Sequence, residues 1–381
     1  MTVLPTGEGT LVLHRSTPIH KAHADFDQPH LELQALDAGI AVHNRISGAI
    51  GFLPGTNEST DAAFDGETRV STIGDQALDD LERAGLFNRI RHPFPLPVTF
   101  AKSHRYVSQV YQFGARTVEL QCPIPEILEA LQATLGPLLK QPSVEQDGDV
   151  ISLQFHGDGF GVFANGKPVF GQCDFAYARH FVMREIAISL AGRKEVSATF
   201  HAGAAGTSDR AFIFAADSGS GKSTLTAALC ANGFVYHNDD QVALVGGEGR
   251  ISSFPTRIGL KQGSWSVVEM DAYNIDAIEP TFLGEGYAKL VLPEIVGEPE
   301  IRPEIAAFVF PAFSTDGPFE LTRISGLEAM QRLITCGARL AGRYPTIRPL
   351  AQTMAKVPAY ALGYSNTVQA MDAVSDLLAR S

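Results

Sequence analysis

The chain has little of the chemistry that stabilises small secreted proteins. It contains four cysteines in 381 residues, far apart and without a C-x-x-C pair, so we expect neither a zinc site nor a disulfide framework. No apolar run approaches the roughly 20 residues of a membrane-spanning helix, and the start of the chain lacks the basic-then-apolar order of a secretory signal. These absences predict a cytoplasmic protein whose thiols stay reduced.

Positive charge is also scarce. Lysine and arginine number 30 against 42 aspartates and glutamates, which gives a formal net charge of -12. Because the sequence has no sustained basic patch, we expect neither nucleic-acid binding nor attachment to an anionic membrane. The length predicts about two or three domains, and 45% hydrophobic residues are enough for more than one core.

One stretch, residues 211–241, organises the rest of the chain. A short apolar run at 211–216 predicts a buried strand, and the glycine-rich residues 218–221 predict a turn. A helix is then expected from Lys222, with Gly233 placed to end it. The order is therefore strand, turn, helix, second strand and acidic turn.

A glycine-rich turn between a strand and a helix leaves main-chain N–H groups free to bind phosphate at the helix N-terminus. Residues 216–223, Ala-Asp-Ser-Gly-Ser-Gly-Lys-Ser, fit the pattern G-x-x-x-x-G-K-[ST] except that Ala216 replaces the first glycine. We expect Lys222 to reach the β and γ phosphates of ATP and Ser223 to place its hydroxyl on Mg²⁺. A chance match is the alternative, but the strand-to-helix position favours a phosphate site. The expected nucleotide-binding residues are Ser218, Gly219, Ser220, Gly221, Lys222, Ser223 and Thr224.

The second strand, expected at 234–237, is followed by Asn238, Asp239 and Asp240. If the sheet is parallel, these acidic residues face the phosphate site, because ligands gather at the carboxyl ends of parallel strands. One carboxylate is expected to hold Mg²⁺ and the other to accept the proton of an attacking hydroxyl. We take Ser223 and Asp240 as the metal ligands, although the residues do not decide between the two aspartates. An ordinary solvated turn is the alternative.

Four short motifs lie in or near this stretch: His201-Ala202-Gly203, the loop 217–224, Asn232-Gly233-Phe234 and the pair Asp239-Asp240. Together they resemble the catalytic domain of HPr kinase/phosphorylase, which shares a fold with phosphoenolpyruvate carboxykinase. The resemblance covers residues 196–381 and is strongest over 196–245. It implies that Asp239 and Asp240 form the acid/base and metal pair and that His201 lies near the transferred phosphate. For His201, a satisfied core histidine is the alternative.

The sequence also departs from that family. The Glu-Ile-Arg-Gly-Leu-Gly type of signature is absent, and its nearest remnant, residues 256–260, has no glutamate two residues before Arg257. A second metal carboxylate and HPr itself as the substrate are therefore not expected. Arg257 or Lys261 is expected to clamp the transferred phosphoryl group, with two solvated cations as the alternative, and Lys289 is a weaker candidate.

The residues before 196 are expected to form an α+β region. Strands are predicted within 31–43, 98–120 and 150–170, with Asn165-Gly166 as a two-residue hairpin turn, and helices at 75–86, 125–139 and 176–190. A polar loop is expected at 55–66 and a junction at 87–98. His20, His23, Asp25 and His30 fit no metal-ligand spacing and are interpreted as scattered surface residues. The helix at 176–190 is expected to pack against the sheet that follows.

After residue 241 the pattern predicts further strands at 241–245, 249–254 and 305–313. Helices are expected at 326–340, 346–355 and 367–378, the last capped by Ser365 or Asn366.

The predicted fold is α/β: a P-loop kinase domain of the HPr kinase and phosphoenolpyruvate carboxykinase type at 196–381, behind an α+β accessory domain at 1–195. The expected activity is ATP- and Mg²⁺-dependent transfer of the γ-phosphate to a hydroxyl, with Asp239, Asp240, His201, Lys222 and Arg257 as catalytic residues. The resemblance implies a serine of a protein or peptide as acceptor, because relatives act on such serines, including those of lasso-peptide precursors. A small-molecule kinase and a nucleotide-gated ATPase without an acceptor remain open, as does a homo-oligomer.

Overall fold

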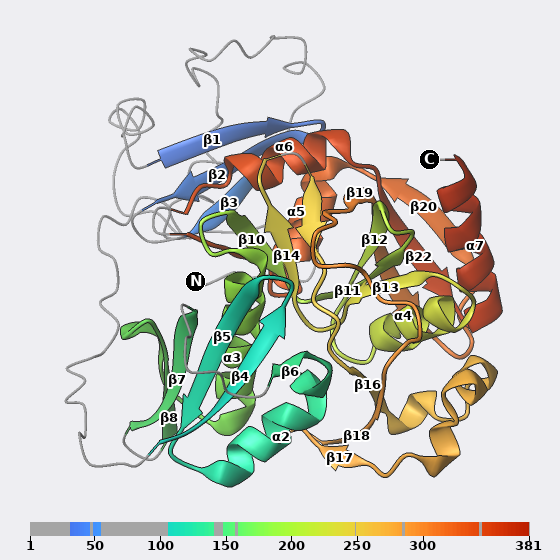
Figure 1. Cartoon of the computed structure of the whole chain (residues 1–381). Helices are drawn as coiled ribbons and strands as arrows, with labels where there is room; N and C mark the ends of the chain where they lie inside the picture. The colour runs from blue at the N-terminus through green and yellow to red at the C-terminus, as the bar shows by residue number, and fades with distance from the viewer. Residues whose placement is uncertain are drawn as a thin grey trace.

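The chain folds as a mixed α/β protein with several sheets (Figure 1). The computed structural model describes residues 31–45, 49–54, 106–140, 148–156, 159–247, 249–283, 286–342 and 345–380. The loop expected at 55–66, the helix at 75–86, the junction at 87–98 and the residues His20, His23, Asp25 and His30 lie outside these ranges.

The largest sheet has ten strands, eight of which run in the order β13-β11-β12-β19-β15-β14-β10-β21, with β22 beside β19 and β20 beside β22. The strands expected within 211–216, 234–237 and 305–313 are confirmed as β12, β13 and β19. The ten strands of this sheet have the following bounds: β10 (Val196–Phe200), β11 (Ala202–Gly206), β12 (Arg210–Ala215), β13 (Val235–Asn238), β14 (Val242–Val245), β15 (Arg250–Ser252), β19 (Glu304–Phe313), β20 (Glu320–Ile324), β21 (Arg339–Leu340) and β22 (Ala359–Tyr364).

Strand directions in this sheet are mixed, not uniformly parallel. β11 lies between β12 and β13 and is antiparallel to both, so β12 and β13 are parallel to each other. Ala202 at the start of β11 pairs with Ala215 at the end of β12, and Ala204 pairs with Asn238 at the end of β13. The start of one strand and the ends of two others therefore meet at one edge.

Helices cover both faces of the sheet because β12 is apolar on both sides. Ala211, Ile213 and Ala215 share a core with α5 (Gly326–Thr335) and α6 (Arg348–Lys356). The alternate residues Phe212 and Phe214 share another with α4 (Lys222–Ala231) and α7 (Thr367–Arg380). The N–H of Val368 donates to the Asn366 side chain (2.8 Å), so Asn366 rather than Ser365 caps α7.

Glycines end two of these helices. Gly233 (φ +92°) follows α4, where the N–H groups of Gly233 and Phe234 donate to the carbonyls of Cys230 and Leu229, both at 3.2 Å. The helix expected to run from 326 to 340 ends at Thr335, because Gly337 (φ +97°) turns the chain into the short strand β21.

A second sheet of six strands, in the order β6-β4-β5-β7-β8-β9, precedes the large one. Asn165 (φ 49°) and Gly166 (φ 71°) form its predicted hairpin turn. The bounds are β4 (Val107–Phe113), β5 (Arg116–Cys122), α2 (Pro125–Leu135), β6 (Leu139–Lys140), β7 (Asp149–His156), β8 (Gly159–Ala164), β9 (Lys167–Cys173) and α3 (Phe175–Ala191).

Helix α3 joins the two large sheets. Most of its apolar residues pack into the core of the six-stranded sheet, whereas Ile188 and Ala191 pack with residues of β10 and β14. Apolar residues of α3 thus face both sheets, as expected for a helix buried between them. Its packing against the following sheet is confirmed. Residue 195 lies in the turn after α3, and the division of the chain there stays a prediction.

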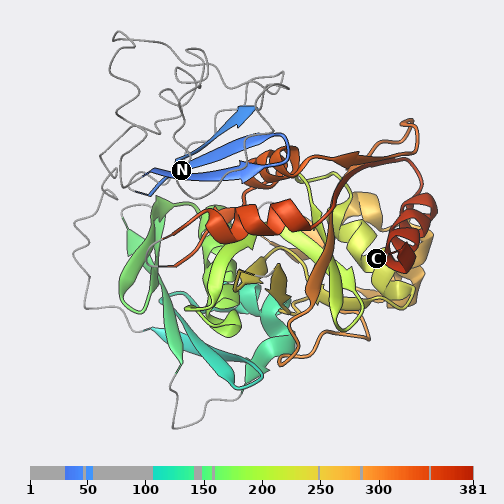
Figure 2. The same cartoon turned by 90° about the horizontal axis from the view of Figure 1, so that it is seen from above.

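The first strands, β1 (Leu31–Leu36), β2 (Gly39–Asn44) and β3 (Ile50–Pro54), pack against α5 and α6 rather than with the six-stranded sheet (Figures 1 and 2). Two carboxylates fix this contact. Asp37 accepts a hydrogen bond from the N–H of Gly326 at the start of α5 (2.9 Å), and Glu32 accepts from those of Ile347 and Arg348 at the start of α6 (3.1 and 3.2 Å). Carboxylates stabilise helix N-termini in this way.

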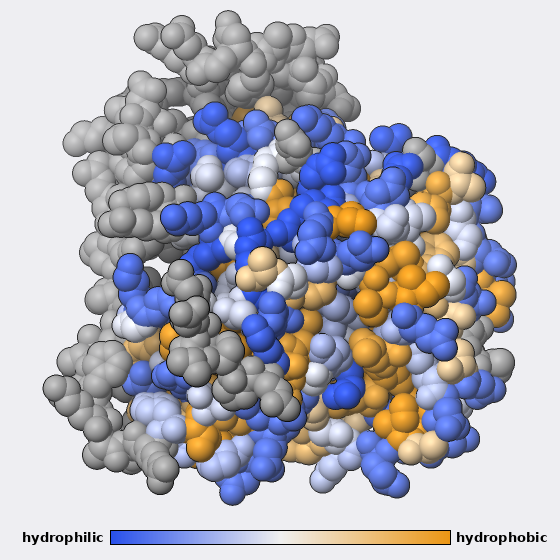
Figure 3. All heavy atoms as spheres, in the orientation of Figure 1, coloured by the Kyte–Doolittle hydropathy of each residue, from blue (hydrophilic) through white to orange (hydrophobic). Residues whose placement is uncertain are grey.

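A small antiparallel sheet of β16 (Ile258–Lys261), β18 (Tyr287–Val291) and β17 (Thr281–Phe282) packs beside α4. None of the described helices is long and apolar enough to cross a membrane. Burial raises the pKa of the free thiols Cys122 and Cys173 to about 11. Figure 3 shows polar and apolar side chains interspersed over the face seen in Figure 1.

We expect Glu32→Gln to destabilise the chain by about 1–2 kcal/mol at pH 7. Burial would raise the pKa of Glu32, but hydrogen bonds from His43, Thr346 and Ile347 outweigh it and lower the pKa to about 2. This stabilisation is fully present above the ordinary pKa of 4.5 and is lost as the pH falls toward 2.

Urea unfolding at pH 7 and pH 3 measures the effect, with the exposed Glu294→Gln as control. Equal stability of wild type and Glu32→Gln at pH 7, or a difference that does not shrink at pH 3, would contradict the prediction.

Candidate active site

The turn between β12 and α4 has the conformation that its glycines predict. Gly219 (φ +90°) and Gly221 (φ +88°) both occupy the left-handed region that favours glycine. A Cβ at Gly221 would also meet the hydroxyl of Tyr364, whereas a Cβ at Gly219 would meet nothing within 4 Å. Position 221 therefore requires glycine both for its backbone angle and for its neighbour.

The turn presents main-chain N–H groups rather than carbonyls. Phe313 donates its N–H to the Ser220 carbonyl (3.2 Å), and the Tyr364 hydroxyl donates to the Gly221 carbonyl (3.4 Å). The first bond within the helix runs from the N–H of Leu225 to Gly221 (2.8 Å), so the N–H groups from Gly221 to Thr224 have no partner inside the helix. With the positive end of the helix dipole, this arrangement favours an anion.

Asp239 lies directly against the start of α4. The Ser223 hydroxyl donates to its carboxylate oxygens at 3.0 and 3.2 Å, and Asp239 is only 5% exposed. Burial raises the pKa of Asp239 to about 6, although the charge of Lys222 and the Ser223 hydrogen bond oppose the rise. Lys222 is itself buried. Of the two aspartates between which the sequence did not decide, Asp239 is the one that contacts Ser223; Asp240 as a metal ligand stays a prediction.

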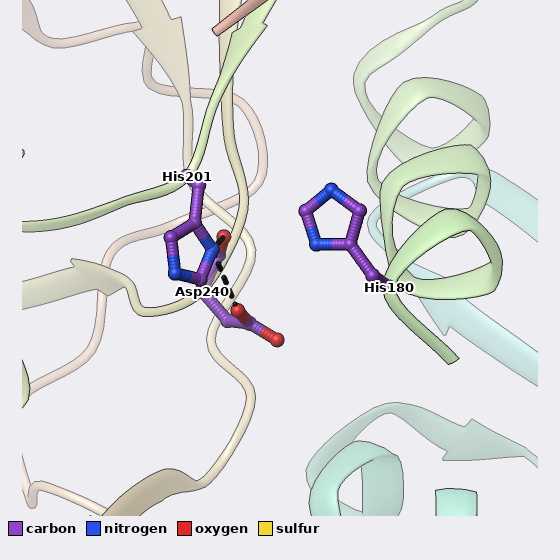
Figure 4. A group of neighbouring side chains, drawn as sticks. All are labelled: His180, His201 and Asp240. Carbon is purple, nitrogen blue, oxygen red and sulfur yellow. Dashed lines mark hydrogen bonds and ion pairs between the residues drawn. The ribbon is translucent and has the colours of Figure 1, made fainter. Parts of the chain in front are cut away.

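Asp240 faces a different group of residues. One carboxylate oxygen lies 3.0 Å from His201 Nδ1 (Figure 4). The other lies 3.3 Å from the Arg179 guanidinium. Burial would raise the pKa of Asp240, but the His201 hydrogen bond and the charges of His201 and Arg179 hold it well below its ordinary value. Two adjacent carboxyl groups with pKa values moved in opposite directions are suited to different roles.

His201 lies at this edge because it immediately precedes β11. Its Nδ1 also lies 3.1 Å from the main-chain oxygen of Asp240, and its side chain is 27% exposed. The structure thus brings His201, Asp239, Asp240 and the turn together at the edge where β11 starts and β12 and β13 end. The backbone of Asp240 has φ +74°, a conformation that is uncommon outside glycine and that aspartate tolerates.

Two residues of this cluster were not predicted, and both come from α3. Arg179 bonds Asp240, and His180 places its ring centroid 5.7 Å from that of His201. Nδ1 of His180 lies 3.3 Å from the Gln241 side-chain amide, and burial lowers the pKa of His180 to about 4. A signal was available, because Arg179-His180, like Arg184-Glu185, interrupts the apolar residues of this helix.

His180, His201 and Asp240 also form a group that could hold a metal ion. Their nearest ligand atoms all lie within 4.8 Å of one another, and two imidazoles with one carboxylate are a usual set for a transition metal. The contacts of Asp240 with His201 and Arg179, and that of His180 with Gln241, already account for their packing, however.

The cations that follow β15 lie in different places. Arg257 donates to the Ala133 carbonyl (2.8 Å) near the end of α2, whereas Lys261 donates to the Ser218 hydroxyl in the turn (2.7 Å). Of the two alternatives, Lys261 is therefore the one that contacts the turn, and the catalytic role of Arg257 stays a prediction. Lys289 is buried, donates to the Ile275 carbonyl (2.8 Å) and lies over the Trp265 ring.

Residues after Lys261 also border the turn. Thr224 and Ser264 share a hydrogen bond of 2.5 Å between their hydroxyls, which joins the first turn of α4 to the short 3₁₀ helix Gln262–Ser264. The small sheet and this helix thus form one wall beside the start of α4.

No protein-family model matches the chain, and no curated protein matches it. Among solved structures, the chain is similar to the HPr(Ser) kinase/phosphatase from Coxiella burnetii, with 12% sequence identity over 47% of this chain and 94% of that one. The TM-score is 0.24, which is too low to carry an argument about the site or its activity. The function of the site therefore has to be argued from its own side chains.

We expect Gly221→Ala to destabilise the chain by about 1–3 kcal/mol more than Gly219→Ala. Both substitutions strain a left-handed backbone at a cost of about 1–2 kcal/mol, but only the first places a methyl group against Tyr364. Thermal or urea unfolding measures the difference. Equal losses in the two variants would show that Tyr364 does not pack on the turn as described.

Proposed function

We propose that this chain is an ATP- and Mg²⁺-dependent phosphotransferase that moves the γ-phosphate of ATP to a hydroxyl group. One observation carries the proposal: Ser223, in the first turn of a helix that follows a glycine-rich turn, shares a hydrogen bond with the buried carboxyl group of Asp239. A hydroxyl and a carboxylate so placed beside a lysine are the parts that hold a metal–nucleotide in P-loop enzymes.

The donors around the turn fit a triphosphate. The N–H groups from Gly221 to Thr224 and the ammonium of Lys222 would bind the β and γ phosphates, while Lys261 would approach from the side of Ser218. All of these groups carry a full or partial positive charge, which the oxygens of a triphosphate require of their binding partners.

Ser223 and Asp239 would hold Mg²⁺, since hydroxyl and carboxylate oxygens are the hard donors that this ion prefers. Bound Mg²⁺ would neutralise charge on the phosphates during transfer. The raised pKa of Asp239 fits this role, because a buried carboxylate beside a single lysine gains from a second positive charge. With Ser223 and Asp239 assigned to the metal, Asp240 and His201 remain to interact with the acceptor hydroxyl.

The acceptor that we propose is a serine hydroxyl of a protein or peptide. The resemblance of the motifs at 201–203 and 217–224 to serine kinases supports this choice. A small-molecule hydroxyl or water would use the same phosphate site, and the destination of the transferred phosphate separates the three.

We expect ATP with Mg²⁺ to raise the melting temperature of the wild-type chain and Lys222→Ala to abolish that shift, because the turn loses its buried cation. Lys261→Ala is expected to reduce the shift, and the exposed Lys356→Ala to leave it unchanged. An unchanged shift in Lys222→Ala would contradict the phosphate site.

The fate of γ-labelled phosphate decides the reaction class. The wild-type chain is incubated with labelled ATP, Mg²⁺ and a pool of serine-containing peptides, or with a small-molecule extract. Label on peptide serine supports the proposal, whereas label on a small molecule, or free phosphate alone, replaces it with one of the other two activities.

The Mg²⁺-dependent part of ATP binding is expected to weaken as the pH falls through 6. The pKa of Asp239 is about 6, so below that value a proton competes with the metal for the carboxylate, by about tenfold per pH unit. Titration with a fluorescent ATP analogue at pH 5, 6 and 7 measures this effect. Asp239→Asn in the same buffers is the control for protonation of the nucleotide, and a pH dependence identical in both proteins would contradict the role of Asp239.

A further inference from the structure

The cluster around Asp240 indicates which group takes the proton from the acceptor hydroxyl. Both oxygens of the Asp240 carboxylate are engaged, one with His201 Nδ1 at 3.0 Å and one with Arg179 at 3.3 Å. Both contacts stabilise the ionised carboxylate and would weaken if Asp240 took up another proton. It is therefore better placed to hold a neighbouring group than to act as the base.

The contacts of His201 define its tautomer. Nδ1 lies 3.0 Å from a carboxylate oxygen and 3.1 Å from the main-chain oxygen of Asp240, and both are acceptors only. Nδ1 must therefore carry a proton, and in the neutral ring the lone pair is on Nε2. Figure 4 shows Nδ1 turned to Asp240 and the second nitrogen on the far side of the ring.

Helix α3 holds this arrangement from the other side. Arg179 lies 3.3 Å from Asp240 and 3.4 Å from the hydroxyl of Thr134, while the ring of His180 meets that of His201 edge to face at 5.7 Å. His180 is in turn held by the side chain of Gln241, directly after Asp240. These contacts restrict rotation of the His201 ring.

We propose that His201 is the general base of the reaction, with Asp240, Arg179 and His180 as the residues that position it. This inference rests on the proposed phosphotransfer and adds the identity of its base. The acceptor oxygen bonds to the γ-phosphorus, its proton passes to Nε2 of His201, and the bond from the γ-phosphorus to the bridging oxygen breaks, so that ADP leaves with the electron pair.

The first test requires no acceptor. Nitrogen-15 spectra of the full-length chain labelled at histidine identify the protonated ring nitrogen, with His201→Gln and His237→Gln used for assignment. His201 is expected to be protonated at Nδ1. His237 is the matched control with the opposite tautomer, because its Nε2 lies 2.8 Å from the Thr207 carbonyl and its Nδ1 accepts from the Ser253 hydroxyl (3.0 Å).

The position of the proton on the His201 ring should also change when the Asp240 carboxylate is replaced. In Asp240→Asn, a neutral amide replaces the carboxylate; its oxygen accepts more weakly and its NH₂ group can donate to Nδ1, so a mixture of the two tautomers is expected. Protonation of wild-type His201 at Nε2 would overturn the inference, whatever the activity.

The second test is turnover, with water and the pool of serine-containing peptides as acceptors for labelled ATP. His201→Gln is expected to lower turnover by about 10²–10⁴-fold, the usual loss for a general base, while ATP affinity stays within about twofold of wild type. Added imidazole is expected to restore part of the turnover of His201→Ala, which a merely structural residue would not allow. Melting temperatures check that the variants fold.

The outcomes separate the two proposals. Wild-type turnover in His201→Gln would overturn the base alone and leave the phosphotransfer intact. A wild-type chain that transfers phosphate to no acceptor, neither to water nor to a peptide nor to a small molecule of the extract, would overturn the phosphotransfer, and the base with it.

Discussion

The site depends on the direction of one strand. β11 runs antiparallel between two strands that are parallel to each other, so its first residue comes to the edge where its neighbours end. The glycine-rich turn follows one neighbour and the two aspartates follow the other. Had β12 and β13 been adjacent, His201 would have no route to this edge. Gly203 makes the arrangement compact, because a Cβ there would meet Thr226 and lie 3.3 Å from Asp239.

The two aspartates show how neighbours in sequence acquire different chemistry. Asp239 is buried against a hydroxyl and a lysine, so the energetic cost of its charge is only partly offset and its pKa rises. Asp240 is held by a histidine and an arginine, which outweigh the cost of its desolvation, and its pKa falls. The left-handed backbone of Asp240 marks the bend at which the chain passes from one environment to the other.

Much of the central region could be predicted from the sequence because its signals are local. The apolar run of β12, the glycine turn, the start of α4 and its end at Gly233 depend on residues close together in the chain. The choice between Asp239 and Asp240 could not be predicted, because it depends on which carboxyl group meets Ser223 across the edge of the sheet. For the same reason, the sequence could not predict that Arg257 contacts the end of α2 whereas Lys261 contacts Ser218. Arg179 and His180 were missed because the helix that carries them was taken to belong to a separate region.

The first strands have a consequence for how the chain assembles. Their core partners are α5 and α6, and Asp37 and Glu32 bond main-chain groups 289 and 315 positions further along. Contacts between residues so distant in sequence form late in folding, because closing such a long loop costs conformational entropy. During synthesis, part of the apolar surface of β1 to β3 therefore stays uncovered until α5 and α6 have left the ribosome.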